Sequence, residues 1–144
     1  MVMTTYLDAS AIVKILLREA DAAVARSLWR TGERRSTSVV AYVEARAAIA
    51  AAVRDRRLSP RLARDRRAEL DWRWEEVEPV ALGDQLLRLA GRVADDEGLR
   101  ALDAIHLATA LYLGVARTVF VTWDRRLAAA ATRLGLAVAP ATLP

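Results

Sequence analysis

The sequence predicts an α/β fold in which helices cover both faces of a parallel sheet. Short apolar runs typical of strands alternate along the chain with longer segments that have helical periodicity. Because parallel strands need crossover connections of about a dozen residues or more, helices of this length suit a parallel sheet. The 144 residues fall within the usual size of one domain. We therefore expect a single domain over residues 1–144, with its functional groups at the carboxyl ends of the strands.

The expected strands and helices follow one another along the whole chain. Strands are expected at residues 4–7, 36–38, 78–80, 118–121 and 137–139, and helices at 9–18, 20–30, 39–54, 60–75, 82–96, 102–113 and 124–134. Ser59 and Pro60 are a typical N-cap and first-turn pair, so they mark the start of one helix. Gly98 marks the end of another. No repeat, linker or low-complexity segment divides the chain.

The composition limits the metal chemistry and the cellular location that we expect. The chain has no cysteine, and His106 is its single histidine. Thiolate sites and His-rich sites are therefore excluded, and any metal must rest mainly on oxygen ligands. Asp8 interrupts the amino-terminal apolar segment before a signal-peptide core can form, and the apolar run at 107–116 is too short to span a bilayer. We expect a cytoplasmic protein that does not enter the membrane.

The basic residues are almost all arginines. The net charge is +4, and Lys14 is the only lysine, so 21 of the 22 basic side chains are arginines. Arginine suits bidentate contacts with phosphate or carboxylate, which favours an anionic partner. The alternative is that the arginines reflect the base composition of the genome and solvated helix faces. Charge alone does not decide between these interpretations.

Two aspartates follow predicted strands. Asp8 ends the first strand, and Asp124 follows the strand at 118–121 after two residues. Since the carboxyl ends of parallel strands meet at one edge of the sheet, we expect the two carboxylates to share a site. The alternative for each is a structural role as the N-cap of the helix that follows.

Two further acids lie on predicted apolar helix faces. Glu44 falls beside Val40 and Ala51 on a 3.6-residue period, so its charge needs a partner, either a distant arginine or a metal. Asp103 lies with Leu107 on the apolar side of its helix, although a first-turn interaction with the helix dipole is the alternative. Together the four acids predict a carboxylate cluster at one edge of the sheet.

A carboxylate cluster needs cations. Two like charges about 4 Å apart repel by roughly 4 kcal/mol at an effective dielectric constant near 20. Ligands that are all oxygen select hard ions, and Mg²⁺ or Mn²⁺ held by carboxylates and waters is the usual arrangement for phosphoryl chemistry. One ion would activate water and a second would stabilise the leaving oxygen, with a phosphodiester as the attacked group.

The motifs resemble those of PIN-domain nucleases. The resemblance rests on the segment YLDASA at residues 6–11, on the inward Glu44, on LDAIHLA at 102–108 and on VTWD at 121–124, in this order and spacing. More narrowly, the chain resembles VapC-type toxins of bacterial toxin–antitoxin pairs. The likeness runs from about residue 4 to residue 138.

The resemblance implies a five-stranded parallel sheet and Mg²⁺- or Mn²⁺-dependent endoribonuclease activity. It implies that the acids and two hydroxyls have separate roles. Asp8 and Asp103 would bind the metal directly, Glu44 would bind it directly or through water and orient the nucleophile, Asp124 would complete the cluster, and Ser10 and Thr122 would hydrogen-bond the cluster or its waters. For these two hydroxyls, helix capping is the alternative.

The resemblance also implies partners. These are an RNA substrate, a VapB-type antitoxin whose C-terminal segment covers the active site, and a second copy of the chain in a homodimer. Trp29, Trp72 and Trp74 lie on helices too polar to bury them completely, so they are candidates for an interface, with core packing as the alternative. We expect His106 to be a hydrogen-bonded structural residue rather than a ligand.

Two other functions remain open at this point. One is a nuclease of the same fold that processes RNA without an antitoxin, and the other is a non-catalytic nucleic-acid-binding module. A Ser/His hydrolase and a nucleotide-binding enzyme are disfavoured because their glycine-containing motifs are missing from the sequence.

Overall fold

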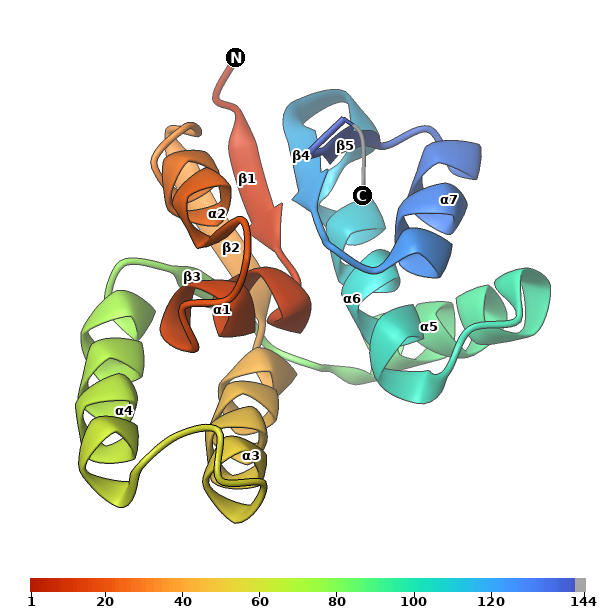
Figure 1. Ribbon diagram of the computed structural model, residues 1–144. Helices are drawn as coiled ribbons and strands as arrows, with labels where there is room; N and C mark the ends of the chain where they lie inside the picture. The colour runs from red at the N-terminus through yellow and green to blue at the C-terminus, as the bar shows by residue number, and fades with distance from the viewer. Residues whose placement is uncertain (142–144) are drawn as a thin grey trace.

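The computed structural model describes residues 1–141 and is built on a five-stranded parallel sheet (Figure 1). The strands are β1 (Thr4–Leu7), β2 (Arg34–Ser38), β3 (Glu78–Val80), β4 (Thr118–Val121) and β5 (Ala137–Ala139). Their order across the sheet is β3-β2-β1-β4-β5, and every neighbouring pair is parallel. The predicted α/β class and parallel sheet are confirmed.

The helices connect the strands as expected. They are α1 (Ala9–Leu16), α2 (Ala22–Trp29), α3 (Val40–Arg54), α4 (Pro60–Trp74), α5 (Asp84–Glu97), α6 (Ala101–Leu113), the short 3₁₀ helix η1 (Val115–Arg117) and α7 (Arg125–Arg133). Ser59 caps α4, because its hydroxyl accepts the Leu62 N–H at 3.1 Å, and Gly98 ends α5 at a positive φ of 63°. The sequence did not predict η1. Within the described residues, none of the helices has the length and apolar character needed to cross a bilayer.

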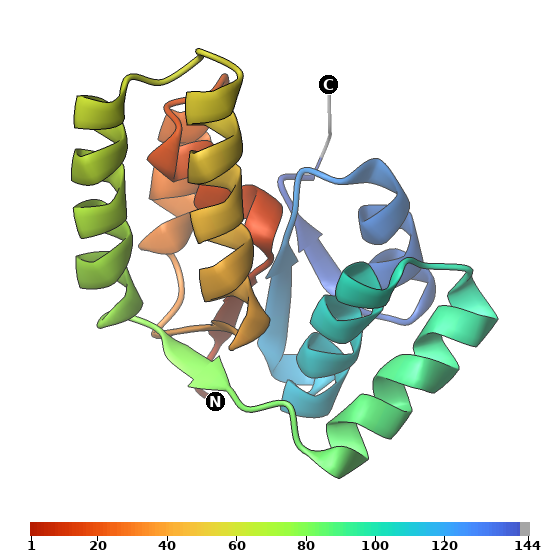
Figure 2. The same cartoon turned by 90° about the horizontal axis from the view of Figure 1, so that it is seen from below.

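The sheet separates two hydrophobic cores. Helices α1 to α4 lie on one side and α5 to α7 on the other (Figures 1 and 2). Successive strand residues point to opposite faces, so Leu7 and Val121 pack in the first core whereas Tyr6 and Phe120 pack in the second. Residues at the carboxyl ends of β1 and β4 therefore lie where the two halves of the molecule meet.

The buried face of α3 differs from the predicted one. Its buried residues are Ala41, Ala45, Ile49 and Ala52, whereas the predicted stripe contained Val40, Ala47 and Ala51. Val43, beside Glu44, is 68% exposed. The cause is the alanine-rich sequence of α3, in which several faces are about equally apolar and periodicity cannot select one. Glu44 therefore lies at the margin of the core.

The helices α3 and α4 form a hairpin, and polar contacts join the two helices to each other and α4 to the segment after α1. Glu69 of α4 accepts hydrogen bonds from Arg73 at 2.7 Å and from Arg18, which follows α1, at 2.9 Å. Burial acts to raise the pKa of Glu69, but the two arginines outweigh it and lower the pKa below its usual range. Tyr42 of α3 donates to Asp71 of α4 at 2.7 Å. The hairpin is thus fixed near its base.

The three tryptophans of the polar helices have different environments. Trp29 is buried and donates its indole N–H to Glu76 at 2.9 Å. Trp74 is partly buried and packs edge-on against Tyr42. Trp72 is 51% exposed. Core packing therefore holds for Trp29, and only Trp72 presents a largely exposed ring.

Candidate active site

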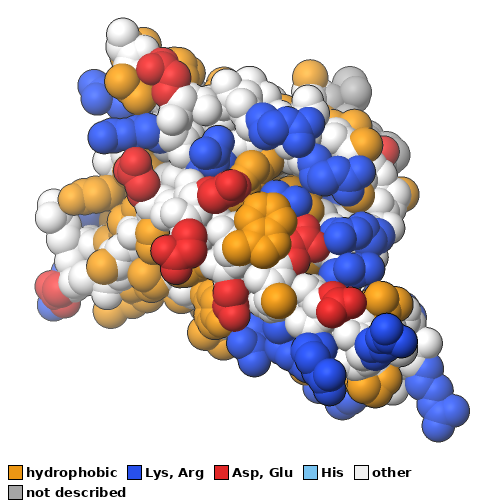
Figure 3. All heavy atoms as spheres, turned by 90° about the vertical axis from the view of Figure 1, so that its left-hand side faces the viewer, with side chains coloured by type: hydrophobic (Ala, Val, Ile, Leu, Met, Phe, Trp, Pro, Cys, Tyr) orange, Lys and Arg blue, Asp and Glu red, His pale blue; other side chains and the backbone are white. Residues whose placement is uncertain are grey.

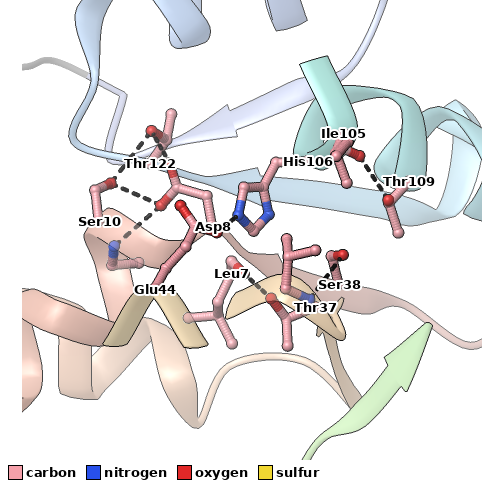
Figure 4. A network of polar contacts seen from close by, with 12 residues as sticks. Leu7, Asp8, Ser10, Thr37, Ser38, Glu44, Ile105, His106, Thr109 and Thr122 are labelled. Atoms are coloured by element: carbon pink, nitrogen blue, oxygen red, sulfur yellow. Dashed lines mark hydrogen bonds and ion pairs between the residues drawn. The ribbon is translucent and has the colours of Figure 1, made fainter. Parts of the chain in front are cut away.

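Asp8 is a buried carboxylate at the carboxyl end of β1, with only 3% of its surface exposed. Its Oδ1 accepts the Ser10 hydroxyl at 2.6 Å and the Ala11 N–H at 3.0 Å, and its Oδ2 accepts the Thr122 hydroxyl at 2.6 Å (Figure 4). The bond from Ala11 makes Asp8 the N-cap of α1. The capping role is therefore present. The three bonds leave Oδ2 with a lone pair free for another ligand, whereas Oδ1 already accepts two hydrogen bonds.

Ser10 and Thr122 tie the start of α1 to the loop after β4. The Trp123 N–H donates to the Ser10 hydroxyl at 3.0 Å, and the Asp124 N–H donates to the Thr122 hydroxyl at 3.0 Å. These bonds hold Asp124 next to Asp8 at the same edge of the sheet. Asp124 is also the N-cap of α7, since its Oδ1 accepts the Leu127 N–H at 3.0 Å.

Glu44 reaches across from α3 to α6. Its Oε1 lies 2.6 Å from Nε2 of His106 (Figure 4). The expectation of a distant arginine or a metal as its partner did not include this histidine. The reason is that the two residues are 62 positions apart and come from helices on opposite sides of the sheet, which sequence periodicity cannot bring together.

His106 is buried and bonded through both ring nitrogens, as expected for a structural histidine. It is 1% exposed, and its Nδ1 lies 2.8 Å from the hydroxyl of Tyr6, which is fully buried. Burial raises the pKa of Tyr6 far above its ordinary value, so the phenol keeps its proton. A neutral ring satisfies both partners when Tyr6 donates to Nδ1 and Nε2–H donates to the Glu44 carboxylate.

Sequence reasoning did not single out Tyr6, and it gave His106 no catalytic partner. One signal for His106 was available: it follows Asp103 by three residues and so lies on the same face of α6. Tyr6 gave no signal, because its position in β1 fits an ordinary core residue.

Asp103 is the carboxylate with the least support from hydrogen bonds. Its one ion pair within residues 1–141 is a 3.8 Å contact with the exposed Arg100. Burial raises the pKa of Asp103, and the negative charges of Asp124 and Glu44 raise it further. The charge of Arg100 lowers the pKa, but it does not offset burial and the two neighbouring carboxylates.

Two of the four carboxylates line a hollow at the surface. Glu44 and Asp103 line a cavity of about 300 Å³ together with Arg100, Ala101 and Leu102. Within residues 1–141, no three Asp, Glu or His side chains lie close enough to hold a metal ion between them as they stand. The predicted cluster is therefore looser than expected.

The donor set nevertheless fits a hard divalent cation. Every candidate ligand is a carboxylate oxygen, and Glu44, Asp103 and Asp124 each have one oxygen without a hydrogen bond to another described residue. Burial also raises the pKa of Asp8, and the hydrogen bonds from Ser10, Thr122 and Ala11 oppose this only in part. Both features are those of a site that a divalent cation would stabilise.

The chain is similar to known proteins in both sequence and fold. The PIN domain family matches residues 5–133. The chain is 42% identical over 140 residues to Ribonuclease VapC45 of Mycobacterium tuberculosis, which covers 96% of each chain. It is 41% identical over 133 residues to Ribonuclease VapC46 of the same organism, which covers 92% of this chain and 94% of that one.

Two solved structures share the fold. PAE2754 from Pyrobaculum aerophilum superposes with a TM-score of 0.69 at 24% identity and covers 96% of this chain and 92% of its own. VapBC2 from Rickettsia felis, bound to a DNA fragment from its promoter, superposes with a TM-score of 0.64 at 13% identity and covers 94% and 97%. At these identities the likeness establishes the fold.

Replacing Asp103 should stabilise the metal-free protein. Asp103→Asn removes a carboxylate that burial and two neighbouring charges oppose, so we expect the free energy of unfolding in EDTA at neutral pH to rise by about 1 kcal/mol. Because the folded pKa is raised, the wild type gains stability as pH falls toward the unfolded pKa, and the advantage of the variant should shrink. Denaturant unfolding between pH 4 and 7.5 measures both effects, with the exposed Asp95→Asn as control. A variant less stable than wild type at neutral pH would contradict this account.

The bond between Glu44 and His106 should couple the two halves of the molecule. A double-mutant cycle with Glu44→Ala and His106→Ala should give an interaction free energy of about 1–3 kcal/mol, as for a buried hydrogen bond to a charged group. A second cycle with Val43→Ala and His106→Ala controls for general loosening of α3, since Val43 is exposed. Equal coupling in both cycles would show that the pair itself contributes nothing.

Proposed function

We propose a specific activity for this chain, which belongs to the PIN-domain family and, within it, to the VapC-type ribonucleases. We infer that it is the endoribonuclease toxin of a toxin–antitoxin pair and that it hydrolyses RNA phosphodiester bonds with Mg²⁺ or Mn²⁺. The observation that carries the proposal is the convergence of Asp8, Glu44, Asp103 and Asp124, from four different parts of the chain, on one edge of the sheet. The relatives named as VapC ribonucleases support the RNA substrate.

The four acids would have distinct roles. Asp8 and Asp103 would be the direct metal ligands, and Asp124 would complete the site. The Ser10 and Thr122 hydroxyls fix both oxygens of Asp8 and so preorganise it. A divalent cation bound here would neutralise charge on the phosphate and lower the pKa of a water molecule.

Glu44 is suited to orient the attacking water. Its Oε1 is held by His106, which leaves Oε2 available to accept a proton from water at the hollow. The bond from His106 to Tyr6 fixes the ring, so the Glu44 carboxylate cannot rotate freely. Attack on the phosphorus atom would expel an oxygen of the adjacent nucleotide, and the acids would hold the reacting groups in place.

The surface around the hollow suits a protein partner. Val39 at the start of α3, Val43 of α3 and Leu102 of α6 are large exposed apolar side chains. Val43 and Leu102 directly precede Glu44 and Asp103 in the sequence. Such a rim favours burial by another chain. We propose that a VapB-type antitoxin covers it, and that the toxin forms a homodimer to which the exposed ring of Trp72 can contribute.

RNA cleavage should depend on both the acids and the cation. Purified chain without antitoxin should release discrete products from a pool of tRNA and ribosomal RNA when Mg²⁺ or Mn²⁺ is present. EDTA, Asp8→Asn and Asp103→Asn should each reduce the rate at least a hundredfold, because each removes a part of the metal site. The control variant Asp95→Asn removes one exposed negative charge on α5 and should cleave RNA like the wild type. Cleavage that persists in EDTA and in both variants would overturn the proposal.

Binding of the cation should be visible without catalysis. A ligand at about ten times its Kd stabilises the folded state by about 1.4 kcal/mol, which corresponds to a Tm increase of about 3–6 °C for a domain of this size. We expect Mn²⁺ to produce such an increase in the wild type and much less in Asp103→Asn. An unchanged Tm at millimolar Mn²⁺ would count against metal binding at this site.

A further inference from the structure

The positive charge of the chain is concentrated in one short segment. Residues 54–67 contain seven arginines and two aspartates, a net charge of +5, so the other 130 residues together carry a net charge of −1. The arginines are Arg54, Arg56, Arg57, Arg61, Arg64, Arg66 and Arg67. We call residues 54–67 the arginine tip. An even spread of arginine over helix surfaces would not produce this distribution.

The arginine tip is the far end of the α3–α4 hairpin. It comprises the last residue of α3, the loop that follows and the first half of α4. Figures 1 and 2 show this hairpin extending away from the sheet, and the lower part of Figure 3, where its end lies, is occupied mainly by Lys and Arg side chains. The acidic side chains in that view lie mostly above it. The arginines therefore form a separate basic surface.

Most of these arginines have no protein partner. Five of the seven are exposed, and within residues 1–141 only Arg57 forms an ion pair, a 3.5 Å contact with Asp55 in which both side chains are more than half exposed. Ser59 and Pro60 also begin α4 here, so the positive end of its helix dipole adds to the charge of the arginines. The guanidinium groups are consequently free to bind an external anion.

The same helix links this surface to the candidate active site. Glu44 lies near the start of α3 and Arg54 at its end, ten residues or about 15 Å apart along the helix axis. Contacts at the base of the hairpin, from Tyr42 to Asp71 and from Arg18 and Arg73 to Glu69, fix its direction. A nucleic acid strand bound at the hollow can extend along α3 to the tip.

We propose that the arginine tip binds the phosphate backbone of the RNA substrate a few nucleotides away from the cleaved bond. This inference rests on the proposed ribonuclease function. The carboxylates of the site repel RNA, and the rest of the molecule supplies no net attraction, so the arginine tip provides the electrostatic attraction for capture. Guanidinium groups bind phosphate in bidentate geometry.

The surface fits RNA better than an acidic protein segment. Protein interfaces depend on buried apolar or aromatic anchors. In the arginine tip, Leu62 is the single exposed large apolar side chain among the described residues, and there is no aromatic residue. Phosphate contacts need no such anchor. RNA is therefore the occupant to which we commit.

RNA binding by inactive protein tests this proposal separately from catalysis. The parent is full-length Asp103→Asn, and the probe is fluorescently labelled bulk tRNA in EDTA. In this background Arg56, Arg57 and Arg61 are replaced by Gln, and a control changes Arg30, Arg92 and Arg117, which are exposed elsewhere and form no ion pair with described residues. Thermal unfolding checks that each variant is folded. Asp8→Asn serves as a second parent.

The salt dependence gives a quantitative expectation. Each phosphate contact with single-stranded nucleic acid contributes about 0.7 to the slope of log K against log salt. Removal of three contacts should lower the magnitude of the slope by about 2 and weaken binding at least about tenfold at roughly 0.1 M salt. The control triple variant should keep the slope and affinity of its parent. In the active chain, the tip variant should raise KM for tRNA and leave kcat nearly unchanged.

The outcomes separate this proposal from the proposed function. Equal losses in the tip and control variants, or no binding of tRNA by the parent, would overturn it. If the tip variant loses antitoxin binding but keeps RNA binding, the surface belongs to a protein partner, and the RNA proposal is also overturned. If the wild type cleaves no RNA but binding depends on the tip, the ribonuclease proposal fails and the RNA surface stands. If cleavage occurs and the tip changes neither binding nor KM, only the inference about the tip fails.

Discussion

The burial of the Asp8 carboxylate at the end of β1 is the constraint on which the rest of the site depends. A buried charge without partners would be strongly destabilising. Asp8 meets this requirement with hydrogen bonds from Ser10, Ala11 and Thr122, which come from the first turn of α1 and from the residue after β4. The same bonds set the entry of the chain into α1 and the position of Asp124. The hydrogen bonds to this one carboxylate therefore fix the positions of two strand ends and two helix starts.

The site lies between the two cores, and few bonds cross that boundary. The contact between Glu44 and His106 joins α3, from the first core, to α6, from the second, and Tyr6 anchors it in the sheet. It places the acid of α3 opposite Asp103 of α6. The raised pKa values of Asp8 and Asp103 indicate that this arrangement opposes their ionisation. The fold thus keeps these carboxylates in place although burial opposes their charge, as a site prepared for a cation requires.

The sequence predicted the features that depend on local pattern. Hydrophobic periodicity over a few residues predicted the strands, and with them the positions of Asp8 and Asp124 after strand ends. A helix-start signal predicted the Ser59 cap. The buried face of α3 could not be predicted in this way, because alanines occupy several faces of that helix. The partner of Glu44 could not be predicted either, since His106 is distant in sequence and lies on a helix across the sheet. Strand ends and helix periodicity predicted the four acids as a cluster, and resemblance to a family implied a role for each. The structure was needed to show what each one touches.

The separation of acidic and basic surfaces follows from what a cation-dependent site needs. Arginines in close ion pairs with Asp8, Glu44 and Asp103 would neutralise the carboxylates and compete with a metal ion for them. Arg100, which lines the hollow, is exposed and lies 3.8 Å from Asp103. RNA, however, needs positive charge near the site in order to approach it. Arginines at the far end of α3 meet both needs, because about 15 Å of solvent-exposed helix exceeds the Debye length at physiological salt, about 8 Å. The carboxylates then keep their charge for the cation, while the arginine tip attracts the nucleic acid.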